Sequence, residues 1–286
     1  MSELFKETFA YAKINLALAI NGLRADGYHD VQSVMQSISL YDVVRVGRTG
    51  NELICRCGAL SGSQNLAYRA AEKFQQRIGE RDGIKIEIEK NIPVEAGLAG
   101  GSSDAAAVLR LLNELYRFPL ADQELRELAG SIGADVAFCL DGGTMWATGR
   151  GNILEELPPA PLMELVVAKP STGVNTKEAY HCFDREGTPS SLEREVWAKA
   201  LSGSNPVQIA SLLTNDLEEI SIRMVPEIGE IKRIMLHNGC YGALMSGSGS
   251  AVFGLAHGKE SALAIARELK AQGYSQVWTA STGSMK

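Results

Sequence analysis

The chain has no long apolar segment. None of its apolar runs approaches the roughly 20 residues that a membrane-spanning helix requires. The apolar stretch Leu16–Ile20 is short and follows Lys13 and Asn15, and it lacks the charged region, longer apolar core and cleavage site of a signal peptide. We therefore expect a cytoplasmic globular protein that does not enter a membrane.

Cysteine and histidine are scarce, and neither is spaced as a metal site. The five cysteines are odd in number and show no Cys-x-x-Cys pair, and the four histidines show no His-x-x-x-His pair. This argues against a disulfide framework and against a zinc site. Cys55 and Cys57, two residues apart on one predicted strand, are expected to be small apolar residues.

Positive charge is also in short supply. The formal net charge is -6 and the pI is about 5.4, so no overall positive field would recruit nucleic acid or a membrane surface. An anionic ligand would need a locally positive site made of helix ends and a few Lys or Arg side chains. The 286 residues, 45% of them hydrophobic, can bury a full core in one large or two modest domains.

The chain contains neither a Walker A sequence nor a Gly-x-Gly-x-x-Gly motif. It does contain a glycine loop, Pro93–Ser103, between a strand predicted by alternation over 84–89 and a helix predicted to begin near Ser103 or Asp104 and to end near Tyr116. The first turn of a helix has unpaired N–H groups and a partial positive charge, which suit a phosphate. A tight turn with a serine cap is the alternative explanation.

Periodicity predicts an α+β protein with mostly antiparallel sheets and helices packed on one side. The proline-rich segment 157–161 suggests a boundary between domains at 1–156 and 157–286. We predict strands over 9–20, 165–168 and 252–255, one or two strands within 34–46, and a last strand near Val277. Further helices are predicted over 65–77, 122–132, 226–237 and 262–272 and around Tyr180, with 184–206 polar and peripheral and 215–218 opening or lying in a helix.

Several polar side chains stand out before any family is considered. Lys13 and Asn15 share one side of a predicted strand and face either solvent or a cleft. Asp135 lies between a helix stop at Gly133 and an apolar run, where a carboxylate is either a hydrogen-bonded structural group or a chemical one. Tyr28 directly follows a turn and precedes a histidine.

Three separated segments resemble the three motifs of the GHMP kinases, a superfamily that includes galactokinase, homoserine kinase and mevalonate kinase. Ala12–Leu16 resembles the first motif, Pro93–Ser103 the second and Met245–Ala251 the third, in matching order over nearly the whole chain. The first motif is followed by Arg24–His29, and Gly133–Val136 resembles a catalytic-acid segment. Together they are similar to the members that act on 4-diphosphocytidyl-2-C-methyl-D-erythritol.

The resemblance implies a two-domain GHMP kinase fold with its active-site cleft between the domains. It also implies ATP- and Mg²⁺-dependent phosphorylation of the C2 hydroxyl of that substrate, in the non-mevalonate route to isoprenoids. Asp135 would be the base near the acceptor hydroxyl, and Lys13 would keep it ionised and stabilise developing charge. Asn15 would position these groups, and Ser102 or Ser103, at the loop's end, would lie near the metal, with Ser103 as the predicted ligand.

The remaining site residues also follow from the resemblance. The ATP site would comprise Asn65, Pro93, Val94, Glu95, Ala96, Gly97, Leu98, Ala99, Gly100, Gly101, Ser102, Ser103 and Asp104. The substrate site would comprise Lys13, Asn15, Tyr28, His29, Asp135, Thr176, Tyr180, Gly247 and Ser248, with Tyr28 and Tyr180 on the two faces of cytosine.

Two positions depart from the family's pattern. Tyr180 stands where a relative has Phe, which keeps the stacking but adds a hydroxyl that needs water or a partner. Glu95 and Ala96 stand where other members have small residues, and a carboxylate so near phosphates would repel them unless it points outward.

Other functions remain as alternatives. Another GHMP kinase, acting on homoserine or mevalonate, would not call for Tyr28, His29 and Tyr180. A nucleic-acid binder fits poorly with the acidic pI, and a nucleotide-binding module without catalysis could lose Lys13 or Asp135, which are both present. We expect a monomer or a weak homodimer that binds a small-molecule substrate and neither nucleic acid nor membrane.

Overall fold

The computed structural model describes residues 5–50 and 52–283, and the chain divides into two compact units. Unit 1 takes its residues from Met1–Ala12, Tyr41–Val94 and Ala99–Asp141, and unit 2 takes them from Lys13–Leu40, Glu95–Leu98 and Gly142–Lys286. Two long strands, β1 (Phe5–Leu23) and β2 (His29–Arg48), contribute residues to both units. The predicted boundary at 156/157 is a different division of the chain and stays a prediction.

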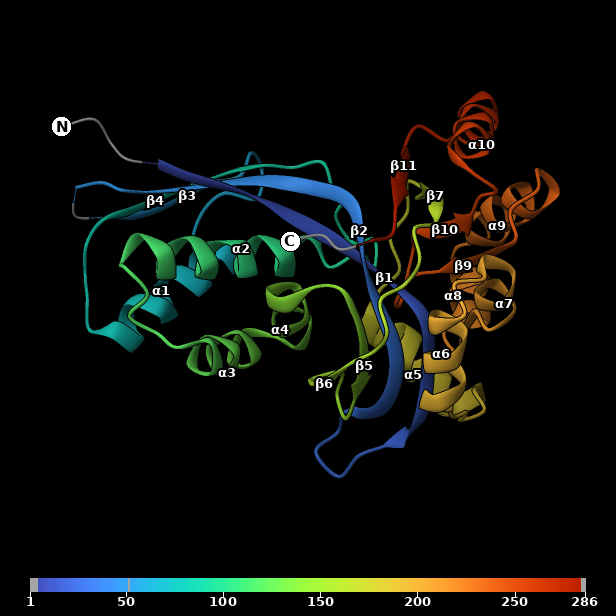
Figure 1. Ribbon diagram of the computed structural model, residues 1–286, viewed down its shortest axis with the longest axis horizontal. Helices are drawn as coiled ribbons and strands as arrows, with labels where there is room; N and C mark the ends of the chain where they lie inside the picture. The colour runs from blue at the N-terminus through green and yellow to red at the C-terminus, as the bar shows by residue number, and fades with distance from the viewer. Residues whose placement is uncertain (1–4, 51, 284–286) are drawn as a thin grey trace. The chain divides into compact units, whose positions relative to one another are not determined.

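In its described residues, unit 1 combines a sheet with four helices. Besides its parts of β1 and β2, it contains β3 (Leu53–Arg56), α1 (Leu66–Ile78), β4 (Ile84–Glu89), α2 (Gly100–Leu115), α3 (Asp122–Ile132) and α4 (Ala134–Asp141). β4 pairs antiparallel with β2 and parallel with β3. Figure 1 shows α1 and α2 on the same side of β3 and β4.

The alternating pattern of β4 explains this packing. Ile84, Ile86 and Ile88 are buried, whereas the residues between them are partly exposed, so one face of the strand is apolar. α1 packs against α2, and Phe74 and Leu109 are fully buried there. The predicted strand over 84–89 is confirmed.

Unit 2 contains a four-stranded antiparallel sheet in the order β11-β7-β10-β9. The strands are β7 (Glu164–Ala168), β9 (Gly242–Met245), β10 (Val252–Leu255) and β11 (Val277–Ser281), and α9 (Glu227–His237) and α10 (Lys259–Ala271) pack against them. The strands predicted over 165–168 and 252–255 and near Val277, and the helices predicted over 226–237 and 262–272, are confirmed to within a few residues.

The rest of unit 2 surrounds its parts of β1 and β2. β5 (Thr144–Thr148) pairs antiparallel with β2 and β6 (Ile153–Glu156), and β8 (Thr214–Asn215) pairs parallel with β1. The remaining helices are α5 (Thr176–Glu186), α6 (Arg194–Ser202), α7 (Pro206–Ser211) and α8 (Glu218–Met224).

One local prediction needs correction. The segment 184–206 is not merely peripheral, because α6 buries Trp197 and Leu201. Asn215 lies in β8, and the segment 215–218 leads into α8 at Glu218, so the prediction that it opens a helix is confirmed. The prediction of one or two strands within 34–46 is also confirmed, because these residues belong to one strand, β2. The apolar run after Asp135 is part of α4.

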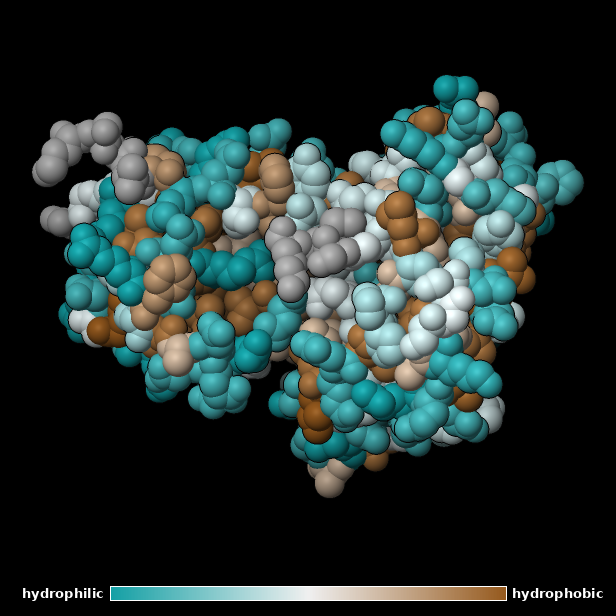
Figure 2. All heavy atoms as spheres, in the orientation of Figure 1, coloured by the Kyte–Doolittle hydropathy of each residue, from teal (hydrophilic) through white to brown (hydrophobic). Residues whose placement is uncertain are grey.

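Hydrophilic residues cover much of the face drawn in Figure 2, with hydrophobic side chains among them. Within residues 5–50 and 52–283, no helix is long and apolar enough to cross a membrane. Tyr28 is one of the large side chains that remain exposed, at 57%.

Candidate active site

The glycine loop bends sharply where its middle residues belong to unit 2. Glu95 and Gly97 have positive φ angles of 53° and 73°. A Cβ on Gly97 would lie 2.0 Å from the carbonyl oxygen of Ser246, so this position accepts only glycine. The hydroxyl of Ser246 donates to the Gly97 carbonyl at 3.0 Å, and the N–H of Ala251 donates to the Ala96 carbonyl at 3.1 Å. The third glycine motif therefore holds the second one in place.

The side chain of Glu95 packs against a neighbouring loop of unit 2. A Cβ built on Gly173 would lie 3.0 Å from Oε2 of Glu95, so the carboxylate lies beside this glycine. Burial lowers the pKa of nearby Lys169, and the charge of Glu95 partly opposes that shift. Glu95, whose carboxylate would repel nearby phosphates, thus lies against the segment 169–173.

Helix α2 begins earlier than the sequence suggests. It starts at Gly100, after Ala99 in a left-handed conformation with φ 57°, rather than at Ser103 or Asp104. Ser103 donates the first helical N–H bond, to the Ala99 carbonyl at 2.8 Å, and no side chain of a described residue caps the helix start. The N–H groups of Gly100, Gly101 and Ser102 therefore form the open first turn.

The two glycines of this turn have different surroundings. A Cβ on Gly100 would lie 2.9 Å from a methyl carbon of Ile92, whereas a Cβ on Gly101 would meet no heavy atom within 4 Å. Gly100 permits close packing inside unit 1, and Gly101 leaves space outside the helix start. This open space next to unpaired N–H groups fits an anionic ligand such as a phosphate.

The two serines of the turn also differ. Ser103 is 1% exposed and its hydroxyl donates to the Tyr11 carbonyl at 2.6 Å, whereas Ser102 is partly exposed. The Ser103 oxygen keeps lone pairs for a cation, but Ser102 is the hydroxyl nearer to solvent. Among the described residues, no group of three His, Cys, Asp or Glu side chains could hold a metal ion.

Asp104, predicted to contact ATP, turns its side chain into unit 1. Lys90 donates to Asp104 Oδ2 at 2.8 Å and also binds Asp42, which accepts the backbone N–H groups of Asn91 and Ile92 at 2.6 and 2.8 Å. Asp104 is 2% exposed and Asp42 is 0% exposed. Among the residues that the structure describes, Asp104 Oδ1 has no hydrogen-bond partner.

The charges of this triad influence one another. Burial raises the pKa of Asp104 to about 7; Lys90 opposes the rise and Asp42 adds to it. Burial alone would lower the pKa of Lys90, but the two carboxylates outweigh it and the net shift is upward. The triad ties the first turns of α2 to the end of β4.

Asn65, expected near adenine, caps α1. Its Oδ1 accepts the N–H of Ala67 at 2.9 Å, and its Nδ2 donates to the Leu60 carbonyl at 2.9 Å. Pro93 and Val94 belong to unit 1, and Val94 is 54% exposed. The capping contacts account for an asparagine at 65 whether or not it also contacts a nucleotide.

Lys13 is buried in unit 2, at 4% exposure, rather than facing solvent. Its Nζ donates to Asn15 Oδ1 at 2.7 Å, and Asn15 Nδ2 donates to the Ser33 hydroxyl at 2.7 Å. The N–H of Lys13 donates to the Leu98 carbonyl of the glycine loop at 3.1 Å. Lys13 and Asn15 thus form a polar chain beneath the loop, as expected for a site and not for a wet strand face.

Asp135 lies in the first turn of α4 and is partly buried. A carboxylate in this position is stabilised by the partial positive charge of the helix N-terminus. Gly133, which precedes α4, ends α3 with its N–H bonded to the Ala129 carbonyl at 3.1 Å. The helix break that the sequence predicts at Gly133 is confirmed.

Unit 2 contains the predicted cytosine residues, and His29 meets α5 there. The rings of His29 and Tyr180 lie 4.6 Å apart between centroids at an angle of 31°. The guanidinium of Arg150 lies over the ring of Tyr28, 4.7 Å from its centroid. His29 Nε2 is 2.7 Å from Asp184 Oδ1. Sequence reasoning missed both Arg150 and Asp184; the Gly-Arg-Gly turn at 149–151 was the only local signal.

Thr176 and Ser248 meet in unit 2, with their hydroxyl oxygens 2.7 Å apart. Gly247 has φ 57°, and Asn215 donates to its carbonyl at 2.8 Å. The third glycine motif therefore brings a polar pair to the start of α5, the helix that carries Tyr180.

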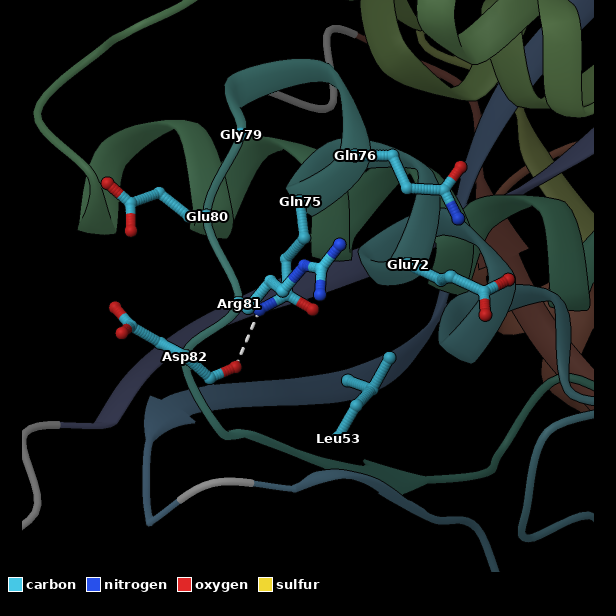
Figure 3. A pocket seen from close by; sticks show the side chains of 8 residues that line it. All are labelled: Leu53, Glu72, Gln75, Gln76, Gly79, Glu80, Arg81 and Asp82. Carbon is cyan, nitrogen blue, oxygen red and sulfur yellow. Dashed lines mark hydrogen bonds between the residues drawn. The ribbon is translucent and has the colours of Figure 1, made fainter.

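Two pockets hold none of the predicted site residues. Figure 3 shows one of about 470 Å³ in unit 1, lined by residues of α1, of the turn that follows it and of β3. Its lining is Leu53, Glu72, Gln75, Gln76, Gly79, Glu80, Arg81 and Asp82. The other, of about 270 Å³ in unit 2, is lined by Lys169, Pro170, Ser171, Glu227, Gln272, Gly273, Tyr274 and Ser275.

Comparison with known proteins defines the class. Residues 65–143 match the family model of the GHMP kinases N terminal domain, and residues 197–275 match that of the GHMP kinases C terminal domain. A crystal structure of a mevalonate kinase from L. major in complex with R-mevalonate is 18% identical with a TM-score of 0.76, covers 98% of this chain and 97% of its own, and shows the shared fold.

Nearer relatives narrow the class. The 4-diphosphocytidyl-2-C-methyl-D-erythritol kinase of Desulfitobacterium hafniense (strain Y51) is 54% identical over 96% of this chain and 95% of its own. The enzyme of that name from Caldicellulosiruptor bescii is 42% identical over 91% and 93%. A crystal structure of a 4-(cytidine 5'-diphospho)-2C-methyl-D-erythritol kinase is 37% identical with a TM-score of 0.86, over 98% of this chain and 100% of its own. The chain belongs to this family of GHMP kinases, small-molecule kinases that use ATP.

Proposed function

We propose that the chain transfers the γ-phosphoryl group of ATP to the C2 hydroxyl of 4-diphosphocytidyl-2-C-methyl-D-erythritol. The product is the 2-phosphate, an intermediate of the non-mevalonate route to isoprenoid precursors. Full-length relatives that carry this enzyme name support the reaction. The observation that carries the choice of substrate is the ring pair of unit 2, where the tilted rings of His29 and Tyr180 are in contact.

The start of α2 would bind the phosphates of ATP. Its first N–H groups are open, Gly101 leaves space beside them, and the helix dipole favours negative charge there. The loop residues 93–104 and Asn65 are the proposed ATP site. Within it, the side chain of Asp104 would not touch phosphate. It would instead support the start of α2 through its contact with Lys90.

Lys13 and Asp135 would carry the chemistry. Asp135 accepts the proton of the acceptor hydroxyl, and Lys13 stabilises the negative charge that develops as the phosphoryl group moves. Burial strengthens the electrostatic effect of Lys13, and Asn15 fixes the direction of its ammonium group. Phosphoryl transfer asks little covalent work of a protein, so alignment and charge stabilisation are the main contributions.

A magnesium ion would supply positive charge beside the ATP phosphates and would need few protein ligands. Mg²⁺ keeps several waters and often takes one or two protein ligands, so the absence of an acidic cluster among the described residues is compatible with its use. Ser103 is the proposed ligand, and the greater exposure of Ser102 makes it the second candidate.

Tyr28 and Tyr180 would flank the cytosine, with His29, Thr176, Gly247 and Ser248 around the rest of the substrate. The family matches fall one on each side of the proposed boundary at 156/157. A cytoplasmic location and a monomer or weak homodimer complete the proposal.

Measuring ADP release tests the substrate. The cytidyl substrate should support turnover, and homoserine and mevalonate should not. Turnover with homoserine or mevalonate alone would assign a different GHMP kinase activity to the chain.

The Asp135→Asn variant tests the base. It should lower kcat by about 10²- to 10⁴-fold and leave ATP affinity nearly unchanged, because the change removes a proton acceptor and not a phosphate contact. Asp141→Asn is the matched control on the same helix; Asp141 pairs with Arg126 near the surface and should be close to wild type. Near wild-type turnover in Asp135→Asn would remove Asp135 from the mechanism.

A further inference from the structure

Asp184 stands one helical turn after Tyr180 on α5 and lies outside the predicted site. Its Oδ1 is 2.7 Å from His29 Nε2, across 155 residues of sequence. The side chain of His29 is 11% exposed and that of Asp184 is 32% exposed. His181 is the other titratable group beside this carboxylate; its Nδ1 lies 3.9 Å from Oδ2 and its side chain is 79% exposed.

The contact determines which nitrogen of His29 carries a proton. An ionised carboxylate can only accept hydrogen bonds, so a neutral imidazole bound to it through Nε2 must have its hydrogen on Nε2. Nδ1 is then an acceptor. Nδ1 makes no hydrogen bond to a residue within 5–50 or 52–283, so the described chain leaves it available to a ligand.

We propose that Asp184 is a positioning residue that selects cytosine over uracil. It holds His29 in the Nε2–H tautomer, so that Nδ1 accepts a hydrogen bond from the exocyclic amino group of cytosine. Uracil carries a carbonyl oxygen at that position, which would place two acceptors against each other. This inference rests on the proposed function, because it requires the base to lie beside Tyr180 and His29.

The Asp184→Asn variant changes the preferred tautomer of His29 while leaving the shape of the site nearly unchanged. The amide has nearly the same size, but its NH₂ group can donate to Nε2 and allow the proton to move to Nδ1. Nδ1–H would then suit the uracil carbonyl. Glu186→Gln is the matched control, since it makes the same carboxylate-to-amide change on the same helix at a residue that pairs with Arg223.

The first measurement is kcat/KM for the substrate and for its uridine counterpart. Wild type and Glu186→Gln should share a strong preference for the cytidyl form. In Asp184→Asn the ratio of the two kcat/KM values should fall by about 10-fold or more, the range expected for one mismatched buried hydrogen bond. Asp184→Glu should retain part of the preference, because it restores an acceptor.

The second measurement needs no substrate. Nitrogen-15 NMR of the His29 ring in the full-length protein should show the proton on Nε2 in wild type and Glu186→Gln, and a shift toward Nδ1 in Asp184→Asn. The His29 signals can be assigned by their loss in His29→Gln.

The outcomes distinguish a failure of the proposed function from a failure of the role proposed for Asp184. If wild type does not use the cytidyl substrate, the proposed function fails even where the NMR result holds. If wild type prefers cytosine and Asp184→Asn keeps the same ratio or the same tautomer, Asp184 does not select the base.

Discussion

Each unit contains an aspartate that fixes a nitrogen group, but the two settings differ in access to water. In unit 1, Asp104 and Asp42 hold Lys90 in a triad whose carboxylates are almost completely buried. In unit 2, Asp184 holds His29 with about a third of its side chain exposed. Water can replace a lost partner in the second case but not in the first. We therefore expect changes in the triad to lower stability, and changes around α5 to alter recognition with little loss of stability.

The largest effect is expected for Lys90→Met. The variant leaves two buried carboxylates without their cation, and such a loss typically costs about 3–5 kcal/mol of the free energy of unfolding. Urea unfolding followed by circular dichroism measures it. Lys85→Met, which breaks the more exposed pair with Glu87 on β4, should cost about 1 kcal/mol or less. Equal losses in the two variants would contradict the difference between buried and exposed ions.

The pH dependence of stability tests Asp104 directly. Because its pKa is raised to about 7 in the folded state and is about 3.9 in the unfolded state, the folded protein holds this proton more tightly. The stability from this group is full below about pH 4 and is lost as the pH rises through about 7. As the pH rises through this range, the free energy of unfolding of wild type should therefore fall relative to that of Asp104→Asn. If the difference in unfolding free energy does not change with pH, the pKa of Asp104 is not raised.

Smaller changes in stability, of opposite sign, are expected when Gly97 and Gly101 are replaced by alanine. Gly97→Ala should cost about 1–3 kcal/mol, because the new Cβ meets the Ser246 carbonyl and φ is positive. Gly101→Ala should instead raise stability by up to about 1 kcal/mol, since the helix gains alanine in open space. Its KM for ATP should nevertheless rise if phosphate approaches there. An unchanged KM for ATP would place the phosphates elsewhere.

The smallest effect on stability is expected at Tyr180. Tyr180→Ala should raise KM for the cytidyl substrate more than KM for ATP, whereas Tyr180→Phe keeps the ring and should stay within about threefold of wild type on both. Equal rises in both KM values for Tyr180→Ala would move the cytosine away from α5. Thermal unfolding of both variants checks that the fold is intact.

Periodicity in the sequence was enough to place most strands and helices. The alternating isoleucines of β4 and the helical spacing of the apolar residues of α1 are local patterns, and the structure confirms the elements they predict. The start of α2 could not be found in this way. Ser102 and Ser103 have the chemistry of caps, but the actual N-cap is Ala99, which has a left-handed conformation and no capping side chain.

The candidate site shows the same division between local and distant causes. The glycine loop could be found because its glycines lie close together in sequence and precede a helical pattern. Arg150 and Asp184 could not, because their contacts with Tyr28 and His29 join segments more than a hundred residues apart. The strand pattern alone did not reveal the burial of Lys13, since a lysine on a strand usually faces water; the resemblance to the GHMP kinases favoured a cleft.

The division of the glycine loop has a practical consequence for protein engineering. Residues 95–98 belong to unit 2, whereas the residues on either side belong to unit 1, and the chain passes between the units five times in all. No single cut can therefore yield either unit as one uninterrupted polypeptide. A cut at 156/157 would keep unit 1 whole in the N-terminal fragment but would divide unit 2 between the two fragments, so complementation between two co-expressed fragments is a better format for dissecting this kinase than isolated domains.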